Sequence, residues 1–227
     1  MRKLFFTLGY LPFLVAGQAG LSTPNPIAGY DFLNRQAIFN PSGLTEEGTL
    51  FFPTKVSTAN IKLKNGRYYT NMKAVMNLLD NELLFQDSLN QLYTAIVPVQ
   101  SVEFIPGDMN INSIFFKTGF PPIDGNTENT FYEVLAEGKA TLLKAYRISY
   151  IDRTPIDRSV SIRHYDTKTF IYLFDGSHIR KLSRNKSDIE NALLYRQNAF
   201  QTYVSSHKIN WKSDSDLAAL FNFINSN

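Results

Sequence analysis

The chain has 227 residues, of which 44% are hydrophobic and 19% are charged, a balance that excludes a disordered or fibrous protein and allows a sizeable core. The formal net charge is +3, and Arg2 and Lys3 supply two of these charges, so the remainder lacks the basic excess on which nucleic-acid binders depend. The sequence contains no cysteine, which excludes disulfide bonds, thiol catalysis and cysteine-ligated metal sites.

Residues 1–19 have the pattern of a secretory signal peptide. Two cations, Arg2 and Lys3, precede the apolar stretch Leu4–Ala16, and small residues follow at the positions that a signal peptidase reads. The apolar stretch is shorter than the roughly 20 residues that a membrane span needs, and it is interrupted by Pro12, so we expect no transmembrane span. The sequence therefore predicts an exported protein that is periplasmic, outer-membrane-associated or extracellular.

Residues 20–57 are rich in proline and glycine, and we expect a loop-rich lead-in with one short strand at Leu50–Phe52. Strand and turn signals then recur through residues 58–184. The clearest is Asn65-Gly66 between two apolar–polar alternating segments, which predicts a hairpin because both turn positions favour positive φ. The expected strands are Ile61–Lys64, Arg67–Leu79, Glu82–Gln86, Leu92–Val99, Val102–Ile105, Phe131–Ala136, Ala140–Ile151, Thr169–Phe174 and His178–Leu182.

Residues 185–227 show helical periodicity instead. Ser187 and Glu190 match a capping box, and a second capping signal occurs at Ser213 and Asp216. Apolar side chains repeat at helical spacing in two sets, Phe200, Tyr203, Val204 and His207, and then Leu217, Leu220, Phe221 and Ile224. We therefore predict a mainly β domain, an antiparallel meander that is barrel-like or a sandwich, with a C-terminal pair or trio of α-helices packed on it, α+β overall.

Two segments support a resemblance. The hairpin from Asn60 to Met72 runs on to Glu82–Phe85, and the tail carries Tyr203-Val204, Lys208-Ile209-Asn210 and a terminal helix at Asp216-Leu217. In these segments the chain resembles uncharacterised secreted β-rich proteins of Bacteroidota. The resemblance implies an envelope or periplasmic location in a Gram-negative cell, and it brings no catalytic residues.

The sequence shows no recognised motif of a catalytic or metal-binding site. The three histidines, His164, His178 and His207, show no His-x-x-x-His spacing, and no Gly-x-Ser-x-Gly elbow is present. The oxygen-rich stretch Asp124–Asn129 lacks the ligand spacing of an EF-hand and is expected to be a polar loop. We predict neither a metal site nor a cofactor.

One loop stands out as a candidate binding site. Around Pro155 the sequence places two Asp-Arg pairs, Asp152-Arg153 and Asp157-Arg158. Such charges can simply pair within a solvated connection between strands, each pair contributing less than about 1 kcal/mol. Alternatively, the two guanidinium groups could bind a carboxylate or a sugar acid.

These observations favour an exported, non-enzymatic binding module with an envelope protein or glycan as partner, and they exclude nucleic acid. Two alternatives remain open at this point. A hydrolase of extracellular polymers would use dispersed carboxylates such as Asp152 and Asp157, one of them with a raised pKa. A carrier of an apolar ligand would need a cavity of several hundred Å³.

Overall fold

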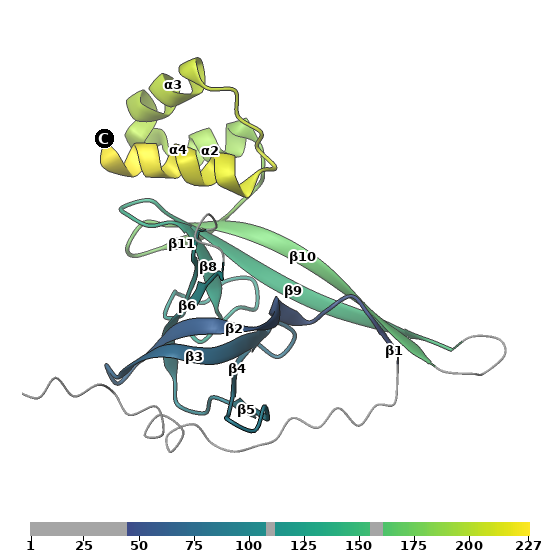
Figure 1. Cartoon of the computed structure of the whole chain (residues 1–227). Helices are drawn as coiled ribbons and strands as arrows, with labels where there is room; N and C mark the ends of the chain where they lie inside the picture. Colours follow the sequence, from purple (N-terminus) through teal and green to yellow (C-terminus); the bar gives the residue numbers. More distant parts are fainter. Residues whose placement is uncertain (1–44, 108–111, 155–160) are drawn as a thin grey trace, which may run out of the picture.

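The computed structural model describes residues 45–107, 112–154 and 161–227 (Figure 1). The predicted signal peptide at residues 1–19 and most of the predicted lead-in at 20–57 lie outside the described residues. Asp157 and Arg158 of the predicted binding loop lie outside them as well.

The described chain is dominated by one eleven-stranded sheet. Its strands are β1 (Thr45–Glu47), β2 (Phe51–Leu63), β3 (Tyr68–Asn77), β4 (Glu82–Gln86), β5 (Leu92–Thr94), β6 (Val99–Ile105), β7 (Ile114–Lys117), β8 (Tyr132–Ala136), β9 (Thr141–Arg153), β10 (Ile162–Phe174) and β11 (Ile179–Leu182). The strand order is β1-β10-β9-β8-β7-β6-β2-β3-β4-β5, with β11 also on β10. Every pair is antiparallel except β1 with β10. The mainly β, largely antiparallel prediction is therefore confirmed, and the sheet remains open rather than closing into a barrel.

The Asn65-Gly66 hairpin is present between β2 and β3, with a different turn. The Leu63 N–H donates to the Arg67 carbonyl at 2.9 Å, and the Gly66 N–H donates to the Leu63 carbonyl at 3.0 Å. Gly66 has a φ of +87°, whereas Asn65 does not have a positive φ. The connection is therefore a three-residue loop with a left-handed glycine, and not the two-residue turn that the dipeptide predicts.

Several strand limits differ from the expected ones. β4 has the predicted bounds. β2 begins at Phe51, inside the predicted lead-in, and a register shift between Phe52 and Ser57 accommodates Pro53 within the strand. β10 begins at Ile162, well before the predicted start at Thr169, because it extends as a partly exposed hairpin strand that lacks the apolar alternation of a half-buried strand.

Three α-helices and a 3-10 turn follow the sheet: α2 (Lys186–Ala192), η1 (Leu194–Arg196), α3 (Gln197–Ser206) and α4 (Asp214–Ser226). The predicted capping box at Ser187 is wrong by two residues. Asn185 is the N-cap of α2, and its side chain accepts from the Asp188 N–H at 2.9 Å. Ser213 is the N-cap of α4 as predicted, since its hydroxyl accepts from the Asp216 N–H at 3.2 Å.

The helices cover one face of the sheet at β8–β11 (Figure 1). The predicted apolar stripe of α4 is fully buried there against side chains of β9, β10 and β11. Its members are Leu217, Leu220, Phe221 and Ile224. Trp211 stacks on Phe200 at 6.4 Å between ring centroids, so it packs between the last two helices.

The end of α4 is fastened to the β8–β9 turn by a single side chain. The Asn225 carboxamide accepts from the Ala140 N–H at 2.9 Å and donates to the carbonyls of Ala140 and Glu137 at 2.9 and 3.3 Å. The turn leaves no room for a larger residue, since a Cβ on Gly138 would lie 2.3 Å from the Asn225 Cγ. The helical layer and the sheet therefore share one interface from the start of α4 to its end.

Candidate functional site

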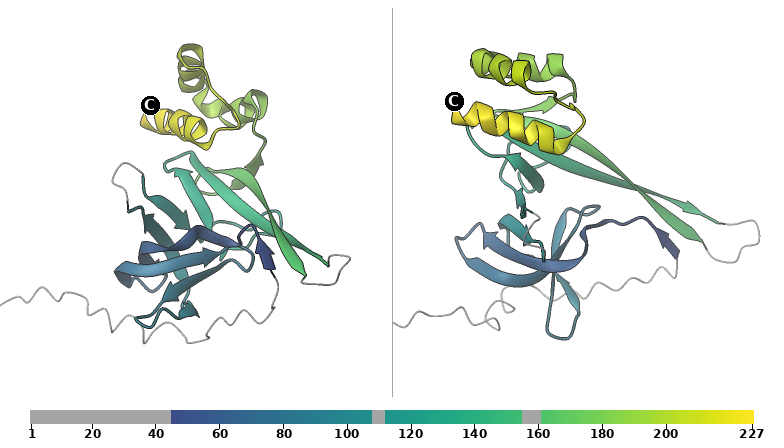
Figure 2. Two further views of the ribbon diagram at one scale, coloured as in Figure 1. Left: turned by 45° about the vertical axis from the view of Figure 1, so that its right-hand side comes forward. Right: turned by 45° about the horizontal axis from the view of Figure 1, so that its top comes forward.

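The β9–β10 hairpin reaches beyond the rest of the sheet (Figures 1 and 2). Its two strands have 13 residues each and pair without a register shift from Thr141↔Phe174 to Arg153↔Ile162. On one side β8 pairs only as far as Lys144, and on the other β11 pairs only as far as Ile171. Among the described strands, only the short β1 therefore pairs with the distal part of the hairpin at its edges.

The two faces of the distal hairpin differ in exposure. Successive side chains alternate between faces, and one face is anchored by the buried side chains of Ile148 and Tyr165. Seven neighbouring side chains of the distal part on the other face are exposed, and we call these the open face. They are Arg147, Ser149, Ile151, Arg153, His164, Asp166 and Lys168, whereas Ile162 and Phe170 on the same face are half-buried and Ala145 is buried. Ile151 is 60% exposed.

Asp152 from the predicted loop pairs across the hairpin rather than with its neighbour. Its two carboxylate oxygens accept from Nε and Nη2 of Arg163, both at 2.7 Å. The guanidinium also lies 4.1 Å from the ring centre of Tyr150. Because consecutive strand residues point to opposite faces, Arg153 lies on the open face and cannot form the expected Asp152-Arg153 pair.

The electrostatics of Asp152 are those of a structural acid. Hydrogen bonds from Arg163 hold the pKa of this carboxyl below its usual value. Every carboxyl of the described residues for which a shift is resolved has a lowered pKa, namely Asp124, Asp152, Asp175, Asp214 and Asp216. The raised carboxyl pKa that a hydrolase reading predicts is not found in the described part of the chain.

Cations gather at the base of the open face, around Phe170. The Lys181 Nζ lies 4.4 Å from the ring centre, and the Arg147 guanidinium carbon lies 5.2 Å from it. Lys168 stands directly opposite Arg147 in the β9–β10 register. Like charges in directly opposed strand positions are destabilising, so this pair costs stability.

The negative charge and the carbonyl group of Asp124 partly offset the positive charge of these cations. Its carboxylate pairs with the Lys181 Nζ at 2.9 Å, and its carbonyl accepts from Arg147 at 2.9 Å. The expected polar loop is here a tight turn, in which Asp124 and Gly125 both have positive φ and the flanking residues exchange two backbone hydrogen bonds. The Tyr172 hydroxyl also donates to Asp124, and burial, with the Asp124 charge, raises the pKa of that phenol to about 12.

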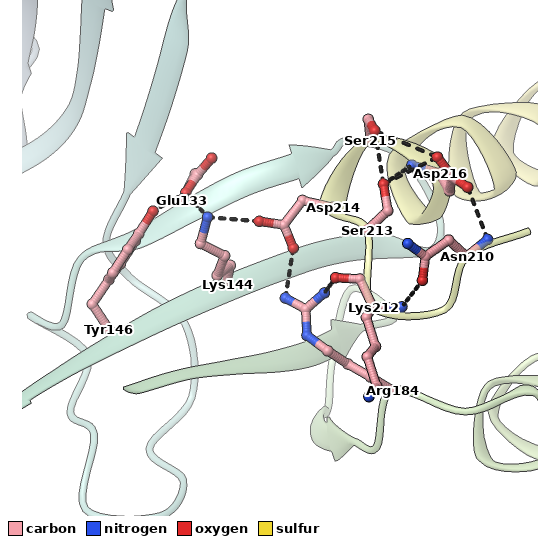
Figure 3. A network of polar contacts seen from close by, with 10 residues as sticks. All are labelled: Glu133, Lys144, Tyr146, Arg184, Asn210, Lys212, Ser213, Asp214, Ser215 and Asp216. Carbon is pink, nitrogen blue, oxygen red and sulfur yellow. Dashed lines mark hydrogen bonds and ion pairs between the residues drawn. The ribbon is translucent and has the colours of Figure 1, made fainter. Parts of the chain in front are cut away.

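A second polar cluster lies between the sheet and the start of α4 (Figure 3). The buried Lys144 ammonium is 2.7 Å from Glu133 and 2.8 Å from Asp214, and Asp214 also pairs with Arg184 at 2.5 Å. The Tyr146 hydroxyl donates to Glu133. Sequence reasoning missed this network, because its members lie on β8, β9, α4 and the connection between β11 and α2 and share no motif.

The charge states of this network do not suit acid–base catalysis. Burial alone would lower the pKa of Lys144, but Glu133 and Asp214 outweigh it and raise the pKa above its usual value. Burial, followed by the charge of Glu133, raises the pKa of Tyr146. Lys144 therefore stays charged and Tyr146 stays neutral near pH 7, so neither can accept a proton as a general base. The network fastens the helical layer to the sheet.

A separate cleft of about 340 Å³ opens between β4, the β5–β6 connection and the segment before β8. Its walls include the apolar side chains of Leu83, Val97 and Phe131 and the carboxylate of Glu82. Its size is at the lower end of the range for small-molecule sites. The cleft is the feature that an apolar-ligand carrier would use, although polar residues also line it.

Comparison of the chain with protein-family models, curated proteins and solved structures finds no match. Within residues 45–107, 112–154 and 161–227, no group of three or more His, Cys, Asp or Glu side chains is placed to hold a metal ion. The described helices include none that is long and apolar enough to cross a membrane. The function of the protein must therefore be inferred from the surface that its described residues form.

Proposed function

We propose that the protein is an exported, non-enzymatic binding module that engages a partner in the cell envelope through the open face of its β9–β10 hairpin. The signal-peptide pattern of residues 1–19 supports the export part of the proposal. The observation that carries the binding assignment is the exposure of seven neighbouring side chains on one hairpin face, with Ile151 among its cations.

The hairpin is braced on the face opposite the open one. There the carboxylate of Asp152 pairs with Arg163, whose guanidinium lies over the ring of Tyr150. A backbone that is already held in place loses less conformational entropy when a partner covers it. Arginine, which the open face carries at Arg147 and Arg153, is among the residue types that most often dominate binding energy.

The competing functions have weaker support. The lowered pKa of Asp152 argues against its use as a general acid. Lys144 stays charged and Tyr146 stays neutral near pH 7, so neither is available as a general base. The 340 Å³ cleft has no feature that ties it to an apolar ligand rather than to solvent.

Affinity capture from envelope extract tests the proposal. The full chain carries a C-terminal tag, and the bait is compared with the double variant Ile151→Glu and Arg153→Glu. Leu194→Glu is the matched control, since Leu194 is 58% exposed on the helical layer, far from the open face in sequence and fold. We expect a retained partner that the hairpin variant loses at least tenfold and the control keeps. Equal retention by all three proteins, or no retention by the wild type, would overturn the proposal.

A further inference from the structure

One edge of β10 is covered at both ends and open in the middle. β1 pairs with Ile162 to His164, and β11 pairs with Ile171 to Phe174. Between them, Asp166 to Thr169 are exposed, and no described strand pairs with them on that edge. An open strand edge is a template for the addition of another strand.

The direction of the backbone groups in this gap follows from its two ends. The Ser161 carbonyl accepts from β1, and the Asp175 N–H donates to His178 across the β10–β11 turn. Both groups therefore point to the outer edge, and strand residues of the same parity point the same way. The N–H and C=O groups of Thr167 and Thr169 consequently face outward, where an incoming strand can bond to them.

The chain already places one short acidic strand on this edge. β1 has the sequence Thr45-Glu46-Glu47 and pairs in parallel with β10. Glu46 accepts from the Tyr165 hydroxyl at 3.2 Å, and Glu47 lies 3.4 Å from His164 Nδ1. The pairing shows that acidic side chains fit beside β10 on both faces.

Cations outnumber acids beside the gap on the face of Lys168. Lys168 lies in the middle of the gap opposite Arg147, and Lys181 lies on β11 at the end of the gap, where it pairs with Asp124. Asp166 is an acid within the gap on this face. No ion pair is found for Lys168 among the described residues, and its pairing with Arg147 costs stability. An acidic side chain placed opposite Lys168 would relieve that repulsion.

We propose that the β10 edge at Asp166–Phe170 binds an extended acidic segment of a partner protein, which adds to the sheet as a strand between β1 and β11. The inference rests on the proposed function and names the chemistry of its partner. Backbone bonds to Thr167 and Thr169 supply the pairing, and acidic side chains at alternate positions meet Lys168 and its cationic neighbours.

Titration of the full chain with synthetic peptides tests the edge. The probe is an acetylated pentapeptide of alternating Thr and Glu, short enough for the gap, labelled for fluorescence anisotropy and titrated to millimolar concentration. Its comparisons are the Thr-Lys pentapeptide, the Thr-Glu pentapeptide N-methylated at alternate residues, and a polyuronic acid. We expect the unmodified acidic peptide to bind at least tenfold more tightly than the Thr-Lys and the N-methylated peptides.

Two variants locate the site. Lys168→Glu should weaken the acidic peptide at least tenfold, and the substitution replaces a like-charge pair with an opposite-charge pair, so it does not threaten folding. Thr167→Pro removes an outward N–H without touching the β9 ladder, and should weaken binding similarly. Lys55→Glu, an equal charge change at an exposed position on β2, should leave binding unchanged.

The outcomes separate the two proposals. Strand addition is overturned if the N-methylated peptide binds as tightly as the unmodified acidic peptide. It is also overturned if the polyuronic acid binds more tightly than the acidic peptide and loses affinity in the Lys168→Glu variant. Absence of peptide binding together with capture that depends on Ile151 overturns the edge alone and leaves the proposed function standing. Capture that is independent of the hairpin, with no peptide binding, overturns both.

Discussion

The contact between Asn225 and the β8–β9 turn gives a stability prediction of defined size. Asn225→Ala removes three hydrogen bonds, two of them to the backbone of Ala140, which is 1% exposed. Leaving a buried donor or acceptor without a partner costs about 1–3 kcal/mol for each group, and local relaxation reduces the sum. We expect the free energy of unfolding to fall by about 2–4 kcal/mol, and Tm to fall by about 5–15 °C for a chain of this length.

Urea denaturation followed by circular dichroism measures this change. The control is Asn227→Ala, because Asn227 lies at the same helix end and donates only to exposed groups of its own helix. It should alter the free energy of unfolding by less than about 0.5 kcal/mol. Gly138→Ala should also destabilise the wild type, and less so in the Asn225→Ala background, where the clashing side chain is absent. An Asn225→Ala protein as stable as the control would refute the reasoning.

Three further perturbations probe how the helical layer is held. Lys144→Met leaves the half of the network formed by Glu133 and Asp214 without its buried cation, and should lower the free energy of unfolding by about 3–5 kcal/mol in the same assay. The folded-state pKa of Asp214 is lowered, with burial opposed by bonds from Lys144 and Arg184. Its stabilisation is therefore complete above the unfolded pKa near 4 and is lost as pH falls through the folded pKa. The stability difference between wild type and Asp214→Asn should accordingly shrink between pH 6 and pH 3, and a constant difference would contradict this. Deleting residues 187–227 exposes the sheet face under the helices, and should abolish the cooperative thermal transition rather than leave its midpoint unchanged.

Local signals in the sequence predicted much of the β domain. Asn65-Gly66 marks a real hairpin, since Gly66 supplies the positive φ that this connection needs. The α4 stripe was predictable for the same kind of reason, because its period of 3.6 residues is a local property.

Other features depend on contacts that no short window contains. The parallel pairing of β1 with β10 joins segments more than 100 residues apart. The Asp124-Gly125 turn carries a recognised turn dipeptide, but the polar residues after it suggested a loop. Lys168 opposite Arg147 and Arg163 opposite Asp152 both follow from the β9–β10 register, which depends on where the hairpin turns and is not contained in any short window of the sequence.

The central claim is that the open face of the β9–β10 hairpin is the binding surface, and site-specific photo-crosslinking in intact cells tests it most directly. A photo-reactive amino acid replaces Ser149 or Asp166 on the open face, and Leu194 or Lys55 at exposed control positions. The account predicts one discrete crosslinked partner from both hairpin positions and none from the controls. Adducts from the control positions with none from the hairpin would contradict it.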